Sequence, residues 1–150
     1  MKISSLQQAR YAYTPKLPGM LRNGIADICV KEGAETKSVA DQDKIQALFP
    51  NTYGKKEITF QKGQNTSASK KQVVGVILSG GQAPGGHNVI CGLYDALKAT
   101  DKENVLYGFK GGPSGLIEDD YVIFDDAFIN EYRNTGGFDI IGSGRTKLET

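Results

Sequence analysis

A strand-like run followed by a glycine-rich loop and a helical pattern constrains this fold more than any other feature. Val73 to Leu78 is a continuous apolar run rich in β-branched residues, typical of a parallel strand buried on both faces. Glycines crowd residues 80–86, and apolar residues then recur at helical spacing, with Pro84 placed to open the helix. This is half of a βαβ unit, and Val105 to Phe109 is its natural second strand.

Residues 1–71 are expected to form an accessory segment and a linker. The pattern predicts a short helix from Leu6 to Tyr13 and a second helix within Val39 to Phe49. Ile58 to Phe60 is predicted to be a short strand. The stretch 61–71 holds one apolar side chain, which is typical of an exposed linker.

Residues 72–150 are predicted to be the first part of an α/β domain with a parallel sheet. Beyond the βαβ unit, Val122 to Phe124 is expected to pair weakly. Ala127 to Tyr132 is predicted to be a short helix, and Phe138 to Ile141 to begin another strand.

Composition excludes several classes of protein. The apolar fraction is 39%, yet no apolar run approaches the roughly 20 residues of a membrane helix. The start of the chain lacks the apolar core of a signal peptide, and Cys29 and Cys91 show no CxxC spacing, so a cytoplasmic protein with reduced thiols is expected. The net charge is +1 and basic residues are not interleaved with aromatics, which argues against nucleic-acid binding.

The loop Ser79 to Asn88, with sequence SGGQAPGGHN, is the best candidate for a binding site. A helix N-terminus offers unpaired N–H groups and partial positive charge, and glycines let an anion approach them. The loop lacks the Lys-Ser/Thr of a P-loop and the GxGxxG spacing of a dinucleotide fold. Phosphate binding is therefore predicted. The alternative is a tight strand-to-helix turn that binds nothing.

Three other side chains deserve weighing as phosphate ligands. His87 is the only histidine, and it could either touch a phosphate or be a hydrogen-bonded structural residue. Arg145 and Lys147 follow a glycine pair at the end of a strand-like run, where open α/β sheets bind ligands. The planar fork of arginine suits phosphate, although an ordinary surface ion pair would also explain it.

Two further features favour structural explanations. The glycines and proline of Gly108 to Leu116 favour a turn over a second anion loop. The acidic pairs at 119–120 and 125–126 lack the pattern of a calcium loop, so a solvated turn and a helix cap are the better interpretations.

Three segments together resemble the phosphofructokinases. Bacterial ATP-dependent members carry a GGDAPGMN-type loop and a later GGT-x-LGS-x-R segment, with counterparts here at 80–88 and 136–145. The long pyrophosphate-dependent branch of the family is the one that the chain resembles most in three sequences: SGGQAPGGHN at 79–88, GFKGGPSGL at 108–116 and NTGGFDIIGSGRTK at 134–147. The segment LQQARYAYTPKLP at 6–18 resembles the N-terminal extension of that branch.

The resemblance implies a three-layer α/β sandwich with a mainly parallel sheet, present here only in its N-terminal portion. It also implies reversible phosphoryl transfer from pyrophosphate to fructose 6-phosphate, with Mg²⁺. Gly81 matches the loop glycine that approaches the donor, and Arg145 the arginine that faces the donor phosphates. Gly80, His87 and Asn88 match supporting positions of the loop.

The family segments that carry the metal-associated aspartate, the catalytic base and the sugar-phosphate arginines have no match before Thr150. The chain is therefore expected to be a truncated piece that is inactive alone, with the Mg²⁺ ligand beyond Thr150 and no catalytic residue of its own. Homo-oligomers are expected at full length. The alternatives are an ATP-dependent phosphofructokinase and a non-catalytic phosphate-sensing module.

Overall fold

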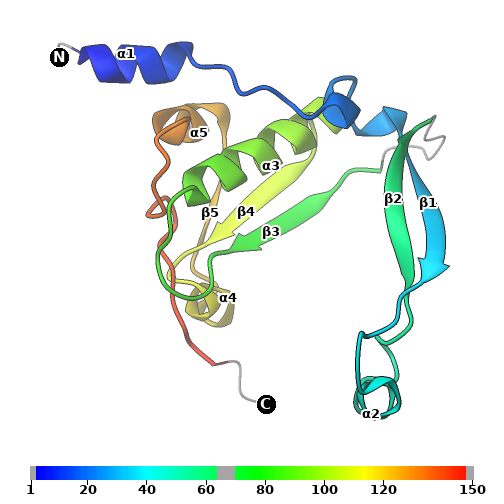
Figure 1. Ribbon diagram of the computed structural model, residues 1–150. Helices are drawn as coiled ribbons and strands as arrows, with labels where there is room; N and C mark the ends of the chain where they lie inside the picture. Colours follow the sequence, from blue (N-terminus) through cyan, green and yellow to red (C-terminus); the bar gives the residue numbers. More distant parts are fainter. Residues whose placement is uncertain (1–2, 64–69, 148–150) are drawn as a thin grey trace. The chain divides into compact units, whose positions relative to one another are not determined.

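The computed structural model describes residues 3–63 and 70–147, which form two compact units (Figure 1). Residues 17–63 make up one unit. The other combines residues 3–16 with 70–147 and is called the α/β unit below. The sequence was expected to divide at residue 71; residues 3–16, which precede that division, group with the α/β unit.

The elements of the α/β unit follow the βαβ pattern that the sequence predicts. In chain order they are α1 (Ser5–Ala12), β3 (Val73–Ile77), α3 (Gly86–Thr100), β4 (Val105–Phe109), α4 (Pro113–Glu118), β5 (Tyr121–Ile123) and α5 (Asp126–Tyr132). Pro84 does not open α3, because Gly85 takes a left-handed conformation as the N-cap and the helix begins one residue later. The helix predictions for α1 and α5 are confirmed.

The sheet of this unit has the strand order β3-β4-β5. β3 and β4 run parallel, in register from Val73 opposite Val105 to Ile77 opposite Phe109, whereas β4 and β5 are antiparallel. The α/β class is therefore confirmed, with one parallel and one antiparallel pairing among the described strands.

The two faces of this sheet differ in burial. Leu106 and Gly108 of β4 are buried on the face that packs against α3, and alternate residues point to the opposite face. There Tyr107 and Tyr121 meet edge to face, with ring centroids 5.0 Å apart. Val73 is 66% exposed, so the prediction that its strand is buried on both faces is wrong: β3 pairs only with β4 in the described sheet.

The hydrophobic core lies between α3, β4, α5 and the segment that follows α5. Its buried residues are Ile90, Cys91, Tyr94, Leu106, Phe124, Ile129, Ile140 and Ile141. Burial raises the pKa of the Cys91 thiol, which disfavours the reactive thiolate. Burial and the hydrogen bond from its hydroxyl to Asp126 raise the pKa of Tyr94 to about 12.

Asn104 is a fully buried polar residue that sequence reasoning missed. Its side-chain oxygen accepts a hydrogen bond from the amide of Gln72 at 2.6 Å, and its side-chain nitrogen donates to the carbonyl of Leu97 at 2.8 Å. The side chain thereby ties the start of β3 to the end of α3. Both of its polar atoms are satisfied, as a buried amide requires.

Replacing Asn104 with leucine should lower the free energy of unfolding by about 2–4 kcal/mol, because two backbone groups lose a hydrogen-bond partner in a buried place. Urea unfolding followed by circular dichroism would measure the change. As a control, Glu103→Leu on the exposed neighbouring residue should change the free energy by less than about 0.5 kcal/mol. Equal stability of the Asn104→Leu variant and the parent would contradict the conclusion that Asn104 ties β3 to α3.

Helix α1 is held to the α/β unit by Asn134. The side-chain nitrogen of Asn134 donates hydrogen bonds to the carbonyls of Arg10 and Tyr13, both at 2.9 Å, at the C-terminal end of α1. Asn134 has a φ of +59°, a left-handed conformation that asparagine tolerates better than most residues. Carbonyl groups at a helix end need such partners.

The unit of residues 17–63 is built on a two-stranded antiparallel sheet. Its elements are η1 (Gly19–Leu21), η2 (Ile25–Asp27), β1 (Ile28–Glu35), α2 (Gln42–Leu48) and β2 (Lys56–Lys62). The predicted strand at Ile58 to Phe60 and helix within Val39 to Phe49 are confirmed, but β1 was not predicted. The stretch 61–71 was expected to be linker, yet Gln61 and Lys62 pair with β1; residues 64–69 lie outside the described residues.

The segment Phe138 to Ile141 is not a strand, contrary to the prediction. Ile140 and Ile141 are both buried, whereas successive residues of a strand point to opposite faces. Their backbone groups bond to single partners rather than to a ladder, such as the Ile141 carbonyl with the Gly111 amide at 2.8 Å. Burial, not strand pairing, accounts for this apolar run. Over the described chain, every helix is too short or too polar to cross a bilayer.

Candidate anion site

The loop between β3 and α3 is fixed at its start by the segment that precedes Arg145. The Gly80 amide donates to the Gly144 carbonyl at 2.8 Å, and Ser79 forms an isolated parallel bridge with Gly144. Gly80 has a φ of +107°, which residues with a Cβ atom rarely adopt. This conformation turns the chain out of the strand and exposes the next residues.

Hydrogen bonds inside the protein occupy some of the loop amides. The Gly85 amide donates to the Gly136 carbonyl at 2.8 Å, and the His87 amide to the Gly137 carbonyl at 2.9 Å. The N–H groups of Gly85 and His87, like that of Gly80, therefore already have a hydrogen-bond acceptor within the protein and are not available to an anion. The anion site predicted over the whole of Ser79 to Asn88 is thus narrower than the sequence suggests.

Gly81, Gln82 and Ala83 form a run of successive loop residues whose amides are open. All three residues are exposed, and their N–H groups make no hydrogen bond within the described parts of the chain. Successive amides at a strand-to-helix turn form an anion-binding concavity. The predicted loop contained all three residues, but the sequence singled out only Gly81, because a main-chain donor leaves no mark on residue type.

Arg145 lies beside the first of these residues, Gly81. A Cβ atom added to Gly81 would lie 3.0 Å from a terminal guanidinium nitrogen of Arg145. Arg145 is exposed, and it has no acidic partner among residues 3–63 and 70–147. The ordinary surface ion pair considered for it is therefore not formed there. The structure brings the two strongest predictions, Gly81 and Arg145, together.

Three segments that contain glycine meet next to Arg145: the loop at Gly80, the turn at 111–112 and the segment 142–144. Gly112 and Gly144 face each other so closely that a Cβ atom on either would overlap the backbone of the other segment. The Gly111 amide also bonds the Ile141 carbonyl. Within the region 108–116, residues 110–112 form a turn between the end of β4 and the start of α4. Its role is to support the backbone next to Arg145.

His87 is buried, with 4% of its surface exposed, and both ring nitrogens have partners. Nδ1 lies 2.6 Å from the Thr135 hydroxyl oxygen, and Nε2 lies 3.0 Å from the Ile140 amide nitrogen. The Thr135 hydroxyl itself donates to the Tyr132 carbonyl at 2.6 Å, so its oxygen accepts from Nδ1–H. The lone pair of a neutral Nε2 is then left to accept the Ile140 N–H.

A competing partner of the same nitrogen is Asp139, whose carboxylate oxygen lies 2.8 Å from Nε2 of His87. A protonated ring would donate to that carboxylate and leave the Ile140 amide without an acceptor. The ring of Tyr132 also packs edge-on against His87, with centroids 4.9 Å apart. Of the two interpretations left open for His87, the geometry favours the structural one.

The remaining predicted positions lie apart from these contacts. Asn88 is exposed in the first turn of α3, and Lys147 is exposed after Arg145. Asp125 caps α5 by accepting from the Phe128 amide, and Asp120 pairs with Lys110 at 2.8 Å, as a cap and a solvated turn would. Over the described residues, no group of three or more His, Cys, Asp or Glu side chains could hold a metal ion.

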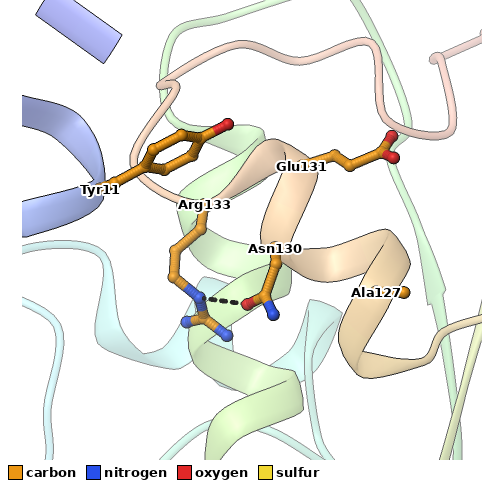
Figure 2. Close-up of a pocket in the computed structure, with 5 residues that line it drawn as sticks. All are labelled: Tyr11, Ala127, Asn130, Glu131 and Arg133. Atoms are coloured by element: carbon orange, nitrogen blue, oxygen red, sulfur yellow. Dashed lines mark hydrogen bonds between the residues drawn. The ribbon is translucent and has the colours of Figure 1, made fainter. Parts of the chain in front are cut away.

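A separate hollow of about 370 Å³ lies between α1 and α5 (Figure 2). It is lined by Tyr11, Ala127, Asn130, Glu131 and Arg133. Arg133 is committed to Asp95 through two hydrogen bonds of 2.7 and 3.0 Å, and to Asn130. None of the sequence-predicted site residues lines this hollow.

No family model matches the chain. Curated relatives match it from end to end, all of them named pyrophosphate–fructose 6-phosphate 1-phosphotransferase or a subunit of it. The protein from Treponema pallidum is 44% identical over 159 residues, and covers all of this chain. The protein from Porphyromonas gingivalis is 50% identical over 149 residues, and subunit beta 1 from Arabidopsis thaliana is 43% identical over 148.

The chain spans only about a quarter of the length of these relatives, between 26% and 28%. The matched part is their N-terminal part. The three relatives are 43–50% identical to the chain, and the matches cover 98–100% of it. The chain is therefore similar, over its whole length, to the N-terminal part of the pyrophosphate–fructose 6-phosphate 1-phosphotransferases.

Proposed function

We propose that the chain carries part of the donor-phosphate site of an enzyme that transfers phosphate from pyrophosphate to fructose 6-phosphate. The observation that carries this proposal is the position of the Arg145 guanidinium beside Gly81, the first of three successive residues with open amides. Within residues 3–63 and 70–147, those amides make no hydrogen bond and the guanidinium has no acidic partner. Phosphoryl transfer depends on positioning and charge neutralisation around the phosphates, and these groups supply both. The names of the relatives supply the donor and the acceptor.

The chain by itself is expected to be inactive. His87 is buried and both of its ring nitrogens have partners within the chain, so we propose no role for it as the base that activates the sugar hydroxyl. We propose that the full-length enzyme uses Mg²⁺ held by residues beyond Thr150; among the described residues, no group of three or more His, Cys, Asp or Glu side chains could hold a metal ion. A three-layer sandwich, homo-oligomers and a cytoplasmic location belong to the same proposal for a full-length enzyme.

Amide NMR of the ¹⁵N-labelled chain tests the donor site. During titration with pyrophosphate, the signals of Gly81, Gln82 and Ala83 should shift most, while those of Gly80 and Gly85 should shift less because their N–H groups are already bonded. Inorganic phosphate should bind more weakly because it offers fewer oxygens. Tighter binding of ATP than of pyrophosphate would favour the ATP-dependent alternative, and shifts confined to other residues would refute the site.

An assay of product formation tests the expectation that the chain is inactive by itself. The purified chain, mixed with pyrophosphate, fructose 6-phosphate and Mg²⁺, should form no fructose 1,6-bisphosphate. Product above the background of a heat-denatured sample would show that the chain is catalytically sufficient.

A further inference from the structure

The segment from Gly136 to Arg145 reaches the anion site without belonging to a sheet. Only its Ser79–Gly144 bridge resembles strand pairing within the described residues. Its course is instead set by single hydrogen bonds to the loop and helix that it packs against. The position of Arg145 therefore depends on a few separate contacts rather than on a regular ladder.

His87 provides several of these contacts. Its amide bonds the Gly137 carbonyl at 2.9 Å, and its Nε2 accepts the Ile140 amide at 3.0 Å. Its ring also occupies the place that a Cβ atom on Gly137 would need, with Nδ1 2.9 Å from that position. His87 belongs to the first turn of α3, which follows the loop that carries the open amides. One residue thus joins the helix next to these amides to the segment that carries Arg145.

We propose that His87 is a positioning residue for the donor site: its neutral ring, by accepting the Ile140 amide, sets the segment that places Arg145 beside Gly81. The inference rests on the proposed function, since the site is taken to bind pyrophosphate. Loss of the acceptor leaves the buried Ile140 N–H without a partner, which is unfavourable until the segment moves. A change at Ile140 then shifts Arg145, five residues along the chain.

Two amide substitutions separate this role from simple packing. Asparagine at position 87 places its polar atoms near the site of Nδ1, where it can still bond Thr135. Glutamine is one methylene longer and can present its oxygen near the site of Nε2, where it can accept the Ile140 amide. The variants His87→Asn and His87→Gln thus have the same functional group and differ in which bond they keep.

Pyrophosphate affinity, measured by calorimetry on the 150-residue chain, should fall about tenfold in His87→Asn and by less than about threefold in His87→Gln. In an Arg145→Ala background the difference between the two variants should vanish, because there is no guanidinium left to misplace. Equal affinities of the two variants, or a difference that persists without Arg145, would overturn the proposal.

NMR gives a readout that does not need pyrophosphate. In the parent chain, a scalar coupling across the hydrogen bond should connect the Ile140 amide nitrogen with Nε2 of His87. Cross-relaxation between protons of Gly81 and Arg145 should be present in the parent and in His87→Gln and lost in His87→Asn. If pyrophosphate fails to bind but this pattern holds, the proposed function falls and the positioning role stands; the same cross-relaxation in all three chains refutes that role.

Thr135→Val provides a second route if His87→Asn does not fold. Valine has nearly the shape of threonine but cannot accept the Nδ1 proton, so the ring is no longer held in the tautomer that leaves Nε2 as an acceptor. The coupling to Ile140 should weaken and pyrophosphate affinity should fall. An unchanged coupling and unchanged affinity in folded Thr135→Val would contradict the proposal.

Discussion

Replacing Gly81 with valine should weaken pyrophosphate binding by about 100-fold or more while the chain remains folded. The added side chain would fill the space between the loop and Arg145, since even its Cβ atom would lie 3.0 Å from the guanidinium. Two or more charge-assisted hydrogen bonds to the anion would be lost, at about 1.5–3 kcal/mol each. Calorimetric titration with pyrophosphate measures the loss.

Gly81 is better suited to this test than its neighbours. Gly80 and Gly85 have positive φ angles, so a side chain at either would strain the backbone, whereas Gly81 is not among the positive-φ residues. Gly92→Val is the matched control, because Gly92 is exposed in α3 with no atom within 4 Å of an added Cβ. It should leave the affinity unchanged. Parental affinity in Gly81→Val would show that the anion does not approach this loop.

Replacing Arg145 with alanine should weaken pyrophosphate binding by roughly 10- to 100-fold, as expected for one or two charge-assisted bonds of about 1.5–3 kcal/mol. Stability should change little, because the exposed guanidinium makes no hydrogen bond or ion pair within residues 3–63 and 70–147. Arg145→Lys should recover part of the affinity, since it keeps the charge and loses the planar fork. Calorimetry gives the three affinities, and thermal unfolding confirms the fold.

Lys102→Ala controls for the change in net charge. Lys102 is an exposed residue just beyond the opposite end of α3, so its removal alters the same formal charge away from the loop. Affinity should stay within about twofold of the parent, because exposed charges at a distance are screened. An equal loss in Lys102→Ala and Arg145→Ala would mean that overall charge, and not a guanidinium at the site, governs binding.

The sequence predicted β3, α3 and β4 because each has a strong local pattern. β4 was predicted with its observed bounds, Val105–Phe109, because it is a short apolar run between polar neighbours. β1 was missed because, after the apolar residues Ile28 to Val30, the rest of the strand is mostly polar and is exposed. Its partner β2 makes it a strand through pairing, which a local pattern does not encode.

Part of the candidate site could also be predicted. Gly81 and Arg145 were identified through the resemblance of their loops, and the structure places them side by side. Which amides stay open could not be predicted, because it depends on carbonyls of Gly136, Gly137 and Gly144 that lie far along the chain. The role of His87 could not be predicted either, because its burial and its hydrogen bond with the Ile140 amide arise from tertiary structure.

The attachment of α1 has a consequence for the order of events on the ribosome. Arg10 and Tyr13 bond a side chain 124 and 121 residues later, so this contact cannot form until Asn134 has been synthesised. Contacts of such long sequence separation also close slowly. The strands of residues 17–63 pair within their own unit and can assemble while Asn134 is still untranslated. Helix α1 therefore takes its place only after these later strands can already have paired.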